Sequence, residues 1–164
     1  MKFKSEVIEI ASKKIIHLPK EISDKLPTRG MVMAKIVIDD VSKTIPIEPD
    51  GKGGHWFEIK GIDTGTEEEF ELELIKDWPE PDMPRDIMKS IEDENLIELW
   101  QSFTTKTRWE WLRWIRSTNN KETRAKRIKD GISKMKDGKR RPCCFNSASC
   151  TVPEVSKSGI LNID

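Results

Sequence analysis

The chain has 164 residues, with 35% apolar and 35% charged side chains and a formal net charge of zero. This length suits one domain or two small ones, and the apolar content predicts an economical core divided between small clusters. The longest apolar run, residues 31–38, is short and contains Lys35, so we expect no membrane-spanning helix.

The first 77 residues are predicted to form short strands. Six segments are rich in branched side chains or alternate polar with apolar residues: 3–10, 14–18, 31–38, 41–47, 55–59 and 69–75. Asp39 and Asp40 predict a hairpin between the third and fourth segments, and Pro19 can begin a short helix containing Ile22 and Leu26. Six such strands predict a small β-barrel, because closure removes exposed sheet edges.

Helical spacing dominates the second half of the chain. Residues 78–84 contain three prolines and predict a stiff linker, after which helices are expected with a break near residues 92–95. Thr104 or Thr105 can cap the next helix, while Asn119 and Glu122 have the spacing of a capping box for the last one. On that last helix one apolar stripe is expected: Ala125, Ile128, Ile132 and Met135.

These patterns predict an α+β protein in four parts. They are a six-stranded β-barrel domain (1–77), a proline-rich linker (78–84), a short all-helical bundle (85–141) and a cysteine-containing tail (142–164). Since ligand pockets favour domain interfaces, we expect a cleft between barrel and helices to be the ligand site.

The segment RWEWLRWIR, residues 108–116, concentrates aromatic and basic side chains. Four of its apolar side chains share one helical face and are expected in the core: Trp111, Leu112, Trp114 and Ile115. Trp109 falls on the opposite, charged side with Arg113 one turn on, a spacing that permits a cation–π contact. Two interpretations of Trp109 stay open: packing against a neighbouring element, or a stacking platform for a ligand.

Charge divides the chain into an acidic and a basic part. Residues 1–103 hold 14 Lys and Arg against 23 Asp and Glu, whereas residues 104–141 hold 14 against 4. The basic helices are consistent with a nucleic-acid-binding surface of salt-sensitive affinity. Two ordinary explanations compete with that hypothesis: a basic surface that faces the acidic barrel, and a solvated helix face.

The cysteines and histidines predict no catalytic site. Cys143, Cys144 and Cys150 are too few and too crowded for an extracellular disulfide framework, and the first ten residues lack a hydrophobic leader, so we expect a cytoplasmic protein. A zinc or redox site at these thiols is a further hypothesis, although adjacent cysteines bind one ion poorly. His55 has no Ser or Cys nucleophile at a recognisable local spacing and is interpreted as a loop or strand-edge residue.

With these motifs in place, the chain resembles the YdeI/OmpD-associated (bacteriocin-protection) family. The hallmark of that family, Glu-Thr-Arg-x-x-Arg-Ile on a helix, is matched by five residues here: Glu122, Thr123, Arg124, Arg127 and Ile128. The first 77 residues resemble a small β-barrel domain of unknown function that often precedes the helical one. That second resemblance rests on His17–Pro19, Arg29–Gly30 and the loop 49–56, and the sequence departs from it at Thr66–Glu69, where a Gly-Asp turn is usual.

The resemblance implies a double-split-type barrel plus a helical bundle, with no established enzymatic activity and no cofactor. We therefore expect an uncharacterised bacteriocin-protection or stress-associated binding protein whose partner is an unknown small molecule or protein. The residues that the motifs select for binding are Trp109, Arg113, Arg124 and Arg127.

Overall fold

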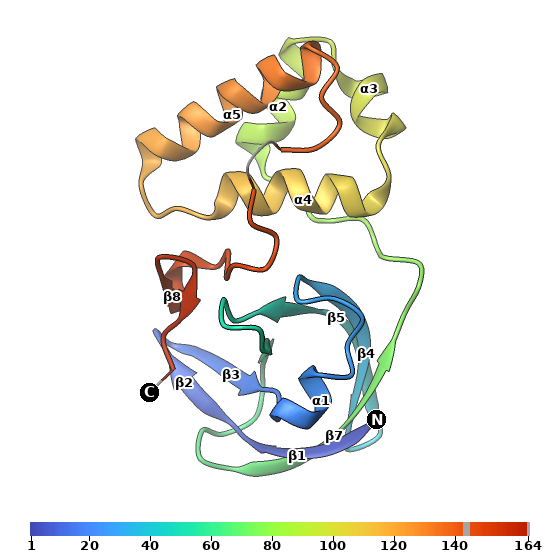
Figure 1. Ribbon diagram of the computed structural model, residues 1–164, viewed down its shortest axis with the longest axis vertical. Coiled ribbons are helices and arrows are strands. Elements are labelled where there is room, and N and C mark those ends of the chain that lie inside the picture. Colours follow the sequence, from blue (N-terminus) through green and yellow to red (C-terminus); the bar gives the residue numbers. More distant parts are fainter. Residues whose placement is uncertain (143–144, 164) are drawn as a thin grey trace. The chain divides into compact units, whose positions relative to one another are not determined.

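The computed structural model describes residues 1–142 and 145–163 and divides into two compact units (Figure 1). One unit, here named the sheet unit, contains residues 1–77, Ser147–Cys150 and the described residues from Glu154 onward. The other, named the helical unit, contains the described residues between Trp78 and Asn146 together with Thr151–Pro153. The predicted α+β class is confirmed.

The sheet unit is a curled antiparallel sheet, a half-barrel (Figure 1). Its strands are β1 (Lys2–Glu6), β2 (Ile8–Ile10), β3 (Lys13–His17), β4 (Val32–Ile38), β5 (Val41–Pro49), β6 (His55–Ile59) and β7 (Glu67–Leu74). They follow the order β1-β7-β4-β5-β6-β3-β2, and the short helix α1 (Lys20–Ser23) comes after β3. The predicted hairpin is confirmed, since Ile38 pairs with Val41 and both intervening aspartates have positive φ.

The prediction of six strands was wrong, because the sheet has seven. The segment predicted as one strand, residues 3–10, bends at Val7, which is fully buried and exchanges backbone hydrogen bonds with Gly65 and Thr66. Each half of the segment then pairs at a different edge: β1 with β7 and β2 with β3. Because β1 and β2 are adjacent in sequence yet occupy opposite edges, the sheet must curl to bring those edges close.

The core of the sheet unit is the inner face of this curled sheet. Alternation along β7 works as predicted, since Phe70 and Leu72 are buried whereas Glu69 and Glu71 are exposed. Phe70 stacks on Phe3 and meets Phe57 edge to face. The aromatic rings thus connect strands that are distant in sequence.

The helical unit contains α2 (Arg85–Asp93), α3 (Ile97–Ser102), α4 (Thr105–Arg116) and α5 (Lys121–Lys136). Thr104 caps α4 as predicted, accepting a hydrogen bond from the Thr107 amide at 3.2 Å. The cap of α5 is Asn120, one residue later than predicted, because its side chain reaches the Thr123 amide at 2.9 Å. No helix within the described residues is long and apolar enough to cross a membrane.

Apolar faces of the four helices form a second core, centred on Trp111. Its ring is fully buried, stacks on Phe103 and meets Trp114 edge to face. Leu112 and Ile115 are also buried, as the helical wheel predicts. Gly131 on α5 faces the rings of Trp111 and Trp114, and a Cβ at this position would lie in ordinary van der Waals contact with them, at 3.5 Å or more.

Most of the described tail, Ser147–Cys150 and the residues from Glu154 onward, belongs to the sheet unit. It forms a hairpin of β8 (Ser156–Lys157) and β9 (Ile160–Leu161), and the Leu161 amide donates to the Asp50 carbonyl at 2.9 Å. Gly51 lies so close that a Cβ there would stand 2.0 Å from the Gly159 carbonyl oxygen. The tail therefore packs directly on the loop between β5 and β6.

Candidate functional site

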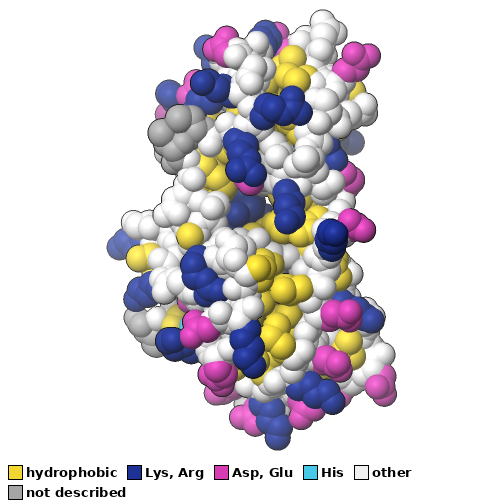
Figure 2. Space-filling model, turned by 45° about the vertical axis from the view of Figure 1, so that its right-hand side comes forward, with side chains coloured by type: hydrophobic (Ala, Val, Ile, Leu, Met, Phe, Trp, Pro, Cys, Tyr) yellow, Lys and Arg dark blue, Asp and Glu magenta, His cyan; other side chains and the backbone are white. Residues whose placement is uncertain are grey.

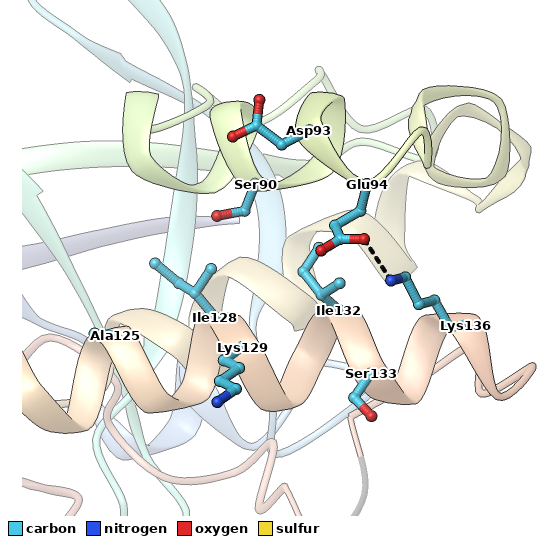
Figure 3. A pocket seen from close by; sticks show the side chains of 9 residues that line it. All are labelled: Ser90, Asp93, Glu94, Ala125, Ile128, Lys129, Ile132, Ser133 and Lys136. Carbon is cyan, nitrogen blue, oxygen red and sulfur yellow. Dashed lines mark hydrogen bonds and ion pairs between the residues drawn. The ribbon is translucent and has the colours of Figure 1, made fainter.

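A groove between α2 and α5 is the candidate ligand site of the helical unit (Figure 3). The two helices run side by side in the same direction, and the groove encloses about 410 Å³ open to solvent. Ser90 on α2 and Ala125 on α5 line it with short side chains that cannot fill the space between the helices. A hollow of this volume is in the range of small-molecule sites.

The apolar stripe predicted on α5 provides the floor of the groove. Ile128 and Ile132 point toward α2 and are each 8% exposed, at the edge of a core that also contains Ile87 and Ile91 of α2 (Figure 3). The same stripe thus packs the two helices together on one side and offers aliphatic surface to the groove on the other.

Arg124, directly before Ala125, connects α5 to Asp86, which lies one turn before Ser90 on α2. Its Nε and Nη2 donate to the two carboxylate oxygens of Asp86 at 2.8 and 3.0 Å, a bidentate geometry. The hydrogen bond from Arg124 lowers the pKa of Asp86 and raises that of Arg124. The pair holds the first turns of both helices together.

Charged side chains of both signs surround the other end of the groove. Glu94 and Lys136 form an ion pair across it, and both are about half exposed. Asp93 points away from the floor on the α2 side, where it pairs with Lys89 at 3.2 Å, while Lys129 borders the α5 side (Figure 3). Among the lining residues, the acidic groups therefore lie on the α2 side and the basic groups on α5, while Lys89 of α2 pairs with Asp93 outside the lining.

The four residues selected from the sequence do not form one cluster. Arg124 lies next to the groove, whereas Arg127 donates from Nη1 to the Trp114 carbonyl at 3.1 Å and to Ser117 Oγ at 2.8 Å. Arg127 thereby joins the Ser117 hydroxyl as a donor to a carbonyl in the last turn of α4, where the helix backbone has no donor to offer. Its contacts fasten α5 to α4.

Trp109 and Arg113 also have contacts within the helical unit. Trp109 is half-buried and its Nε1 donates to the Pro79 carbonyl at 2.8 Å, a contact that favours the packing interpretation. Arg113, expected on the charged face, is 2% exposed and lies 5.4 Å from the centre of the Phe145 ring. The helical wheel misplaced Arg113 because Phe145 lies against that side of α4, which no local periodicity reveals.

Other arginines of the basic region are likewise engaged inside the helical unit. Arg108 forms an ion pair with Glu80 and donates to the Phe103 carbonyl, and Arg140 donates to the Ser102 carbonyl at 3.0 Å. Figure 2 shows Lys and Arg side chains dispersed among acidic and apolar ones over the visible face. On that face the basic groups do not form a continuous stripe.

The sheet unit contains a buried polar cluster that was not predicted from the sequence. Ser23 Oγ and His55 Nδ1 are 2.7 Å apart, and His55 Nε2 lies 2.9 Å from the Gly30 carbonyl. The carbonyl accepts, so Nε2 carries the proton and Nδ1 accepts from the serine. Burial lowers the pKa of His55, with the charge of Arg29 adding to the effect, so the ring is held neutral.

This cluster is not open to a substrate. Ser23 and His55 are 1% and 0% exposed, although their contact has the form of a nucleophile and its base. Their 32-residue separation in sequence explains why local spacing could not reveal the pair. The cluster is a structural network in which every ring nitrogen of His55 has a partner.

The segments that carry the barrel resemblance meet around this cluster. Arg29 donates to the Gly53 and Ser23 carbonyls at 2.7 and 2.8 Å, and His17 Nε2 lies 2.9 Å from Asp50 Oδ2. Asp50 Oδ1 also accepts from the Gly54 amide at 2.9 Å. These contacts hold the loop between β5 and β6 against the end of β3 and the end of α1.

The hypothesis of a thiol site concerns mostly residues outside those described. Cys143 and Cys144 lie outside the described residues, and Cys150 is buried in the sheet unit at 3% exposure. Within residues 1–142 and 145–163, no three His, Cys, Asp or Glu side chains gather as a metal site.

Two family models match the chain. Residues 80–138 match the family described as bacteriocin-protection, YdeI or OmpD-associated, and residues 3–61 match a domain of unknown function, DUF1905. The predicted resemblance is confirmed for both parts, and the first match spans all four helices of the helical unit. No curated protein and no solved structure matches the chain.

Proposed function

We propose that this protein is a non-enzymatic binding protein of the bacteriocin-protection type, and that its helical unit binds an amphipathic ligand between α2 and α5. The observation that carries the proposal is the groove itself. It lies within the residues matched by the family model, has an aliphatic floor at Ile128 and Ile132, and is bordered by charges of both signs. Apolar surface combined with a few polar groups is typical of ligand sites.

Binding fits this groove better than catalysis does. A general acid or base usually acquires its properties from burial and nearby charge. The carboxylates that line the groove, Asp93 and Glu94, are exposed and paired with lysines. The Ser23–His55 pair, which has the chemistry of a nucleophile and base, is sealed in the core of the sheet unit.

Among the residues selected from the sequence, Arg124 has the most direct role in this proposal. Its pair with Asp86 sets the spacing of α2 and α5 where the groove begins. We assign Trp109, Arg113 and Arg127 to the support of α4 and α5. We also propose that the protein acts in the cytoplasm, which fractionation of cells expressing the full chain tests.

The test is a titration of the isotope-labelled full chain with the tripeptide Ala-Ile-Ala, followed by backbone amide NMR. One form of the probe has free ends and another is blocked by acetyl and amide groups. We expect shifts confined to residues 85–94 and 125–136 with at least one form. Ala125→Trp should abolish them, because an indole at this position fills the groove.

The matched control is Lys126→Trp, which places the same ring at the next position, outside the groove lining. This variant should bind like the parent. The proposal is overturned if neither form of the probe shifts the groove amides, or if Ala125→Trp and Lys126→Trp behave alike.

A further inference from the structure

The groove separates its charges by helix. Its lining carries Asp93 and Glu94 on the α2 side and Lys129 and Lys136 on the α5 side, with the aliphatic floor between them (Figure 3). The four charges cancel, so the groove attracts neither polyanions nor polycations as a whole. The lining residues nevertheless place carboxylates on the α2 side and ammonium groups on the α5 side, with the charge of Asp93 balanced by Lys89 until a ligand replaces that lysine.

The charges across the groove are available to a ligand. Glu94 and Lys136 are 46% and 47% exposed, and an ion pair this exposed contributes little to stability. The pair of Asp93 with Lys89 is still more exposed, at 62% and 76%. In either pair, a ligand ammonium group can therefore replace the lysine, and in the Glu94–Lys136 pair a ligand carboxylate can replace the glutamate, at a small cost in free energy.

The hydroxyl groups of the lining complete the pattern. Ser90 and Ser133 both line the groove. Ser90 Oγ donates to the Asp86 carbonyl at 3.1 Å and can still accept from an amide N–H, whereas Ser133 can donate or accept. Ser90 points toward α5 over the floor made by Ile128 (Figure 3). Aliphatic floor, hydroxyls and two opposed charged walls match the parts of a short peptide.

We infer that the ligand of this groove is a zwitterionic short peptide with free ends, an inference that rests on the proposed binding function. Its ammonium group pairs with Glu94 and with Asp93, which must leave Lys89 and turn toward the groove. Its carboxylate pairs with Lys129 and Lys136, and an aliphatic side chain contacts Ile128 and Ile132. A nucleic acid does not meet these requirements, because its phosphates would face the carboxylates of α2. A neutral apolar compound leaves both walls unused.

The experiment measures the affinity of the full chain for four forms of Ala-Ile-Ala: free, N-acetylated, C-amidated and doubly blocked. Each single block should weaken binding by about two- to fivefold, the range of one exposed ion pair. The doubly blocked form should bind most weakly. Equal affinities for the four forms would overturn the inference while leaving the binding function intact.

Two double variants, each replacing the charged side chains of one helix by neutral amides, assign each end of the peptide to one side of the groove. In Asp93→Asn/Glu94→Gln, acetylation should no longer matter while amidation keeps its effect. In Lys129→Gln/Lys136→Gln the reverse is expected. All four positions border solvent at the groove, so both variants should fold. If both variants respond to the two blocks as the parent does, the assignment fails.

Failure of the proposed function has a different signature. In that case no form of the peptide shifts the amides of residues 85–94 and 125–136, and Ala125→Trp changes nothing. Failure of the inference alone leaves the binding and its loss in Ala125→Trp, but removes the dependence on the free ends.

Discussion

Arg124 on α5 and Asp86 on α2 form a bidentate ion pair, with N–O distances of 2.8 and 3.0 Å. The pair joins two helices within the segment that matches the family model, at the first turn of each. Asp86 is also close to the Ile87 amide, at 2.9 Å from Oδ1, where a negative charge suits the N-terminus of α2. Arg124 therefore holds α5 and α2 together beside the groove.

Removing the Arg124 side chain should therefore destabilise the helical unit. We expect Arg124→Gln to lower the free energy of unfolding by about 1 kcal/mol, a modest value because the two side chains are 29% and 49% exposed. Arg124→Lys should recover only part of the loss, since an ammonium group cannot bind both oxygens in the same way. Urea unfolding of each variant gives the comparison.

A double-mutant cycle with Asp86→Asn isolates the pair. The cost of Arg124→Gln should shrink in the Asp86→Asn background, with a coupling of about 0.5–1 kcal/mol. The pKa of Asp86 is lowered by Arg124, so the coupling is present above pH 3.8 and is lost as the pH falls below it. Additive effects of the two substitutions at pH 7 would show that the pair contributes nothing.

His55 should make the sheet unit sensitive to mild acid. Burial lowers its pKa from 6.5, so the unfolded chain binds a proton more readily than the folded one. Stability is then fully present above about pH 6.5 and falls at lower pH, by at most about 1.4 kcal/mol per pH unit. Urea unfolding between pH 8 and pH 5, followed by a probe in the sheet unit, measures this dependence.

Substitution of His55 tests this assignment. His55→Gln should lower stability and flatten the pH dependence between pH 8 and pH 5. Ser23→Ala should cost about 1–3 kcal/mol, because it leaves Nδ1 of a buried ring without its partner. A pH dependence that survives His55→Gln would assign the titration to another group.

Two glycines in one loop offer a matched test of how the tail packs. Gly51 and Gly53 have nearly the same positive φ, 85° and 86°, but a Cβ at Gly53 meets nothing within 4 Å. Gly53→Ala should cost roughly 1–2 kcal/mol from backbone strain alone. Gly51→Ala should cost clearly more, because its methyl group would collide with the Gly159 carbonyl.

Thermal unfolding of the two alanine variants measures the difference. Proteolysis should also cut the tail of Gly51→Ala earlier than that of Gly53→Ala, since only the first displaces the segment around Gly159. Equal stability and equal cleavage of the two variants would contradict the close packing of tail and loop.

Local patterns in the sequence predicted most elements correctly. The alternation of β7, the aspartate hairpin, and the faces of α4 and α5 each depend on neighbours a few residues away. The extra strand was missed because the bend at Val7 depends on hydrogen bonds to residues 65 and 66, far along the chain. A local pattern around Val7 cannot reveal partners that lie almost 60 residues away.

The candidate site was less predictable than the fold. The stripe Ala125–Ile128–Ile132 was visible, but the groove also needs Ser90 and Glu94, which α2 and its C-terminal end supply from about 30 or more positions earlier. The burial of Arg113 depends on residue 145, and the partner of His55 lies on α1. Helical periodicity identifies a face, whereas tertiary packing decides which side chains remain open on it.

Trp109 provides the test of the nucleic-acid hypothesis. Its indole is half-buried and donates to Pro79, so Trp109→Ala should weaken the packing of the proline-rich segment and lower stability by about 1–3 kcal/mol. Binding of single-stranded DNA, followed by fluorescence anisotropy at several salt concentrations, should be weak and unchanged by the substitution. A loss of DNA affinity in a still-folded Trp109→Ala protein would support the stacking platform instead.

The last prediction concerns the cell. If the groove serves the bacteriocin-protection function, bacteria expressing the full chain should survive a peptide bacteriocin better than bacteria expressing Ala125→Trp, because the indole occupies the space that the ligand needs. Lys126→Trp should protect like the parent, and immunoblots should show equal amounts of the three proteins. Survival measured over a range of bacteriocin concentrations gives the result. Equal protection by Ala125→Trp would separate the groove from the protective activity, whatever peptides it binds in solution.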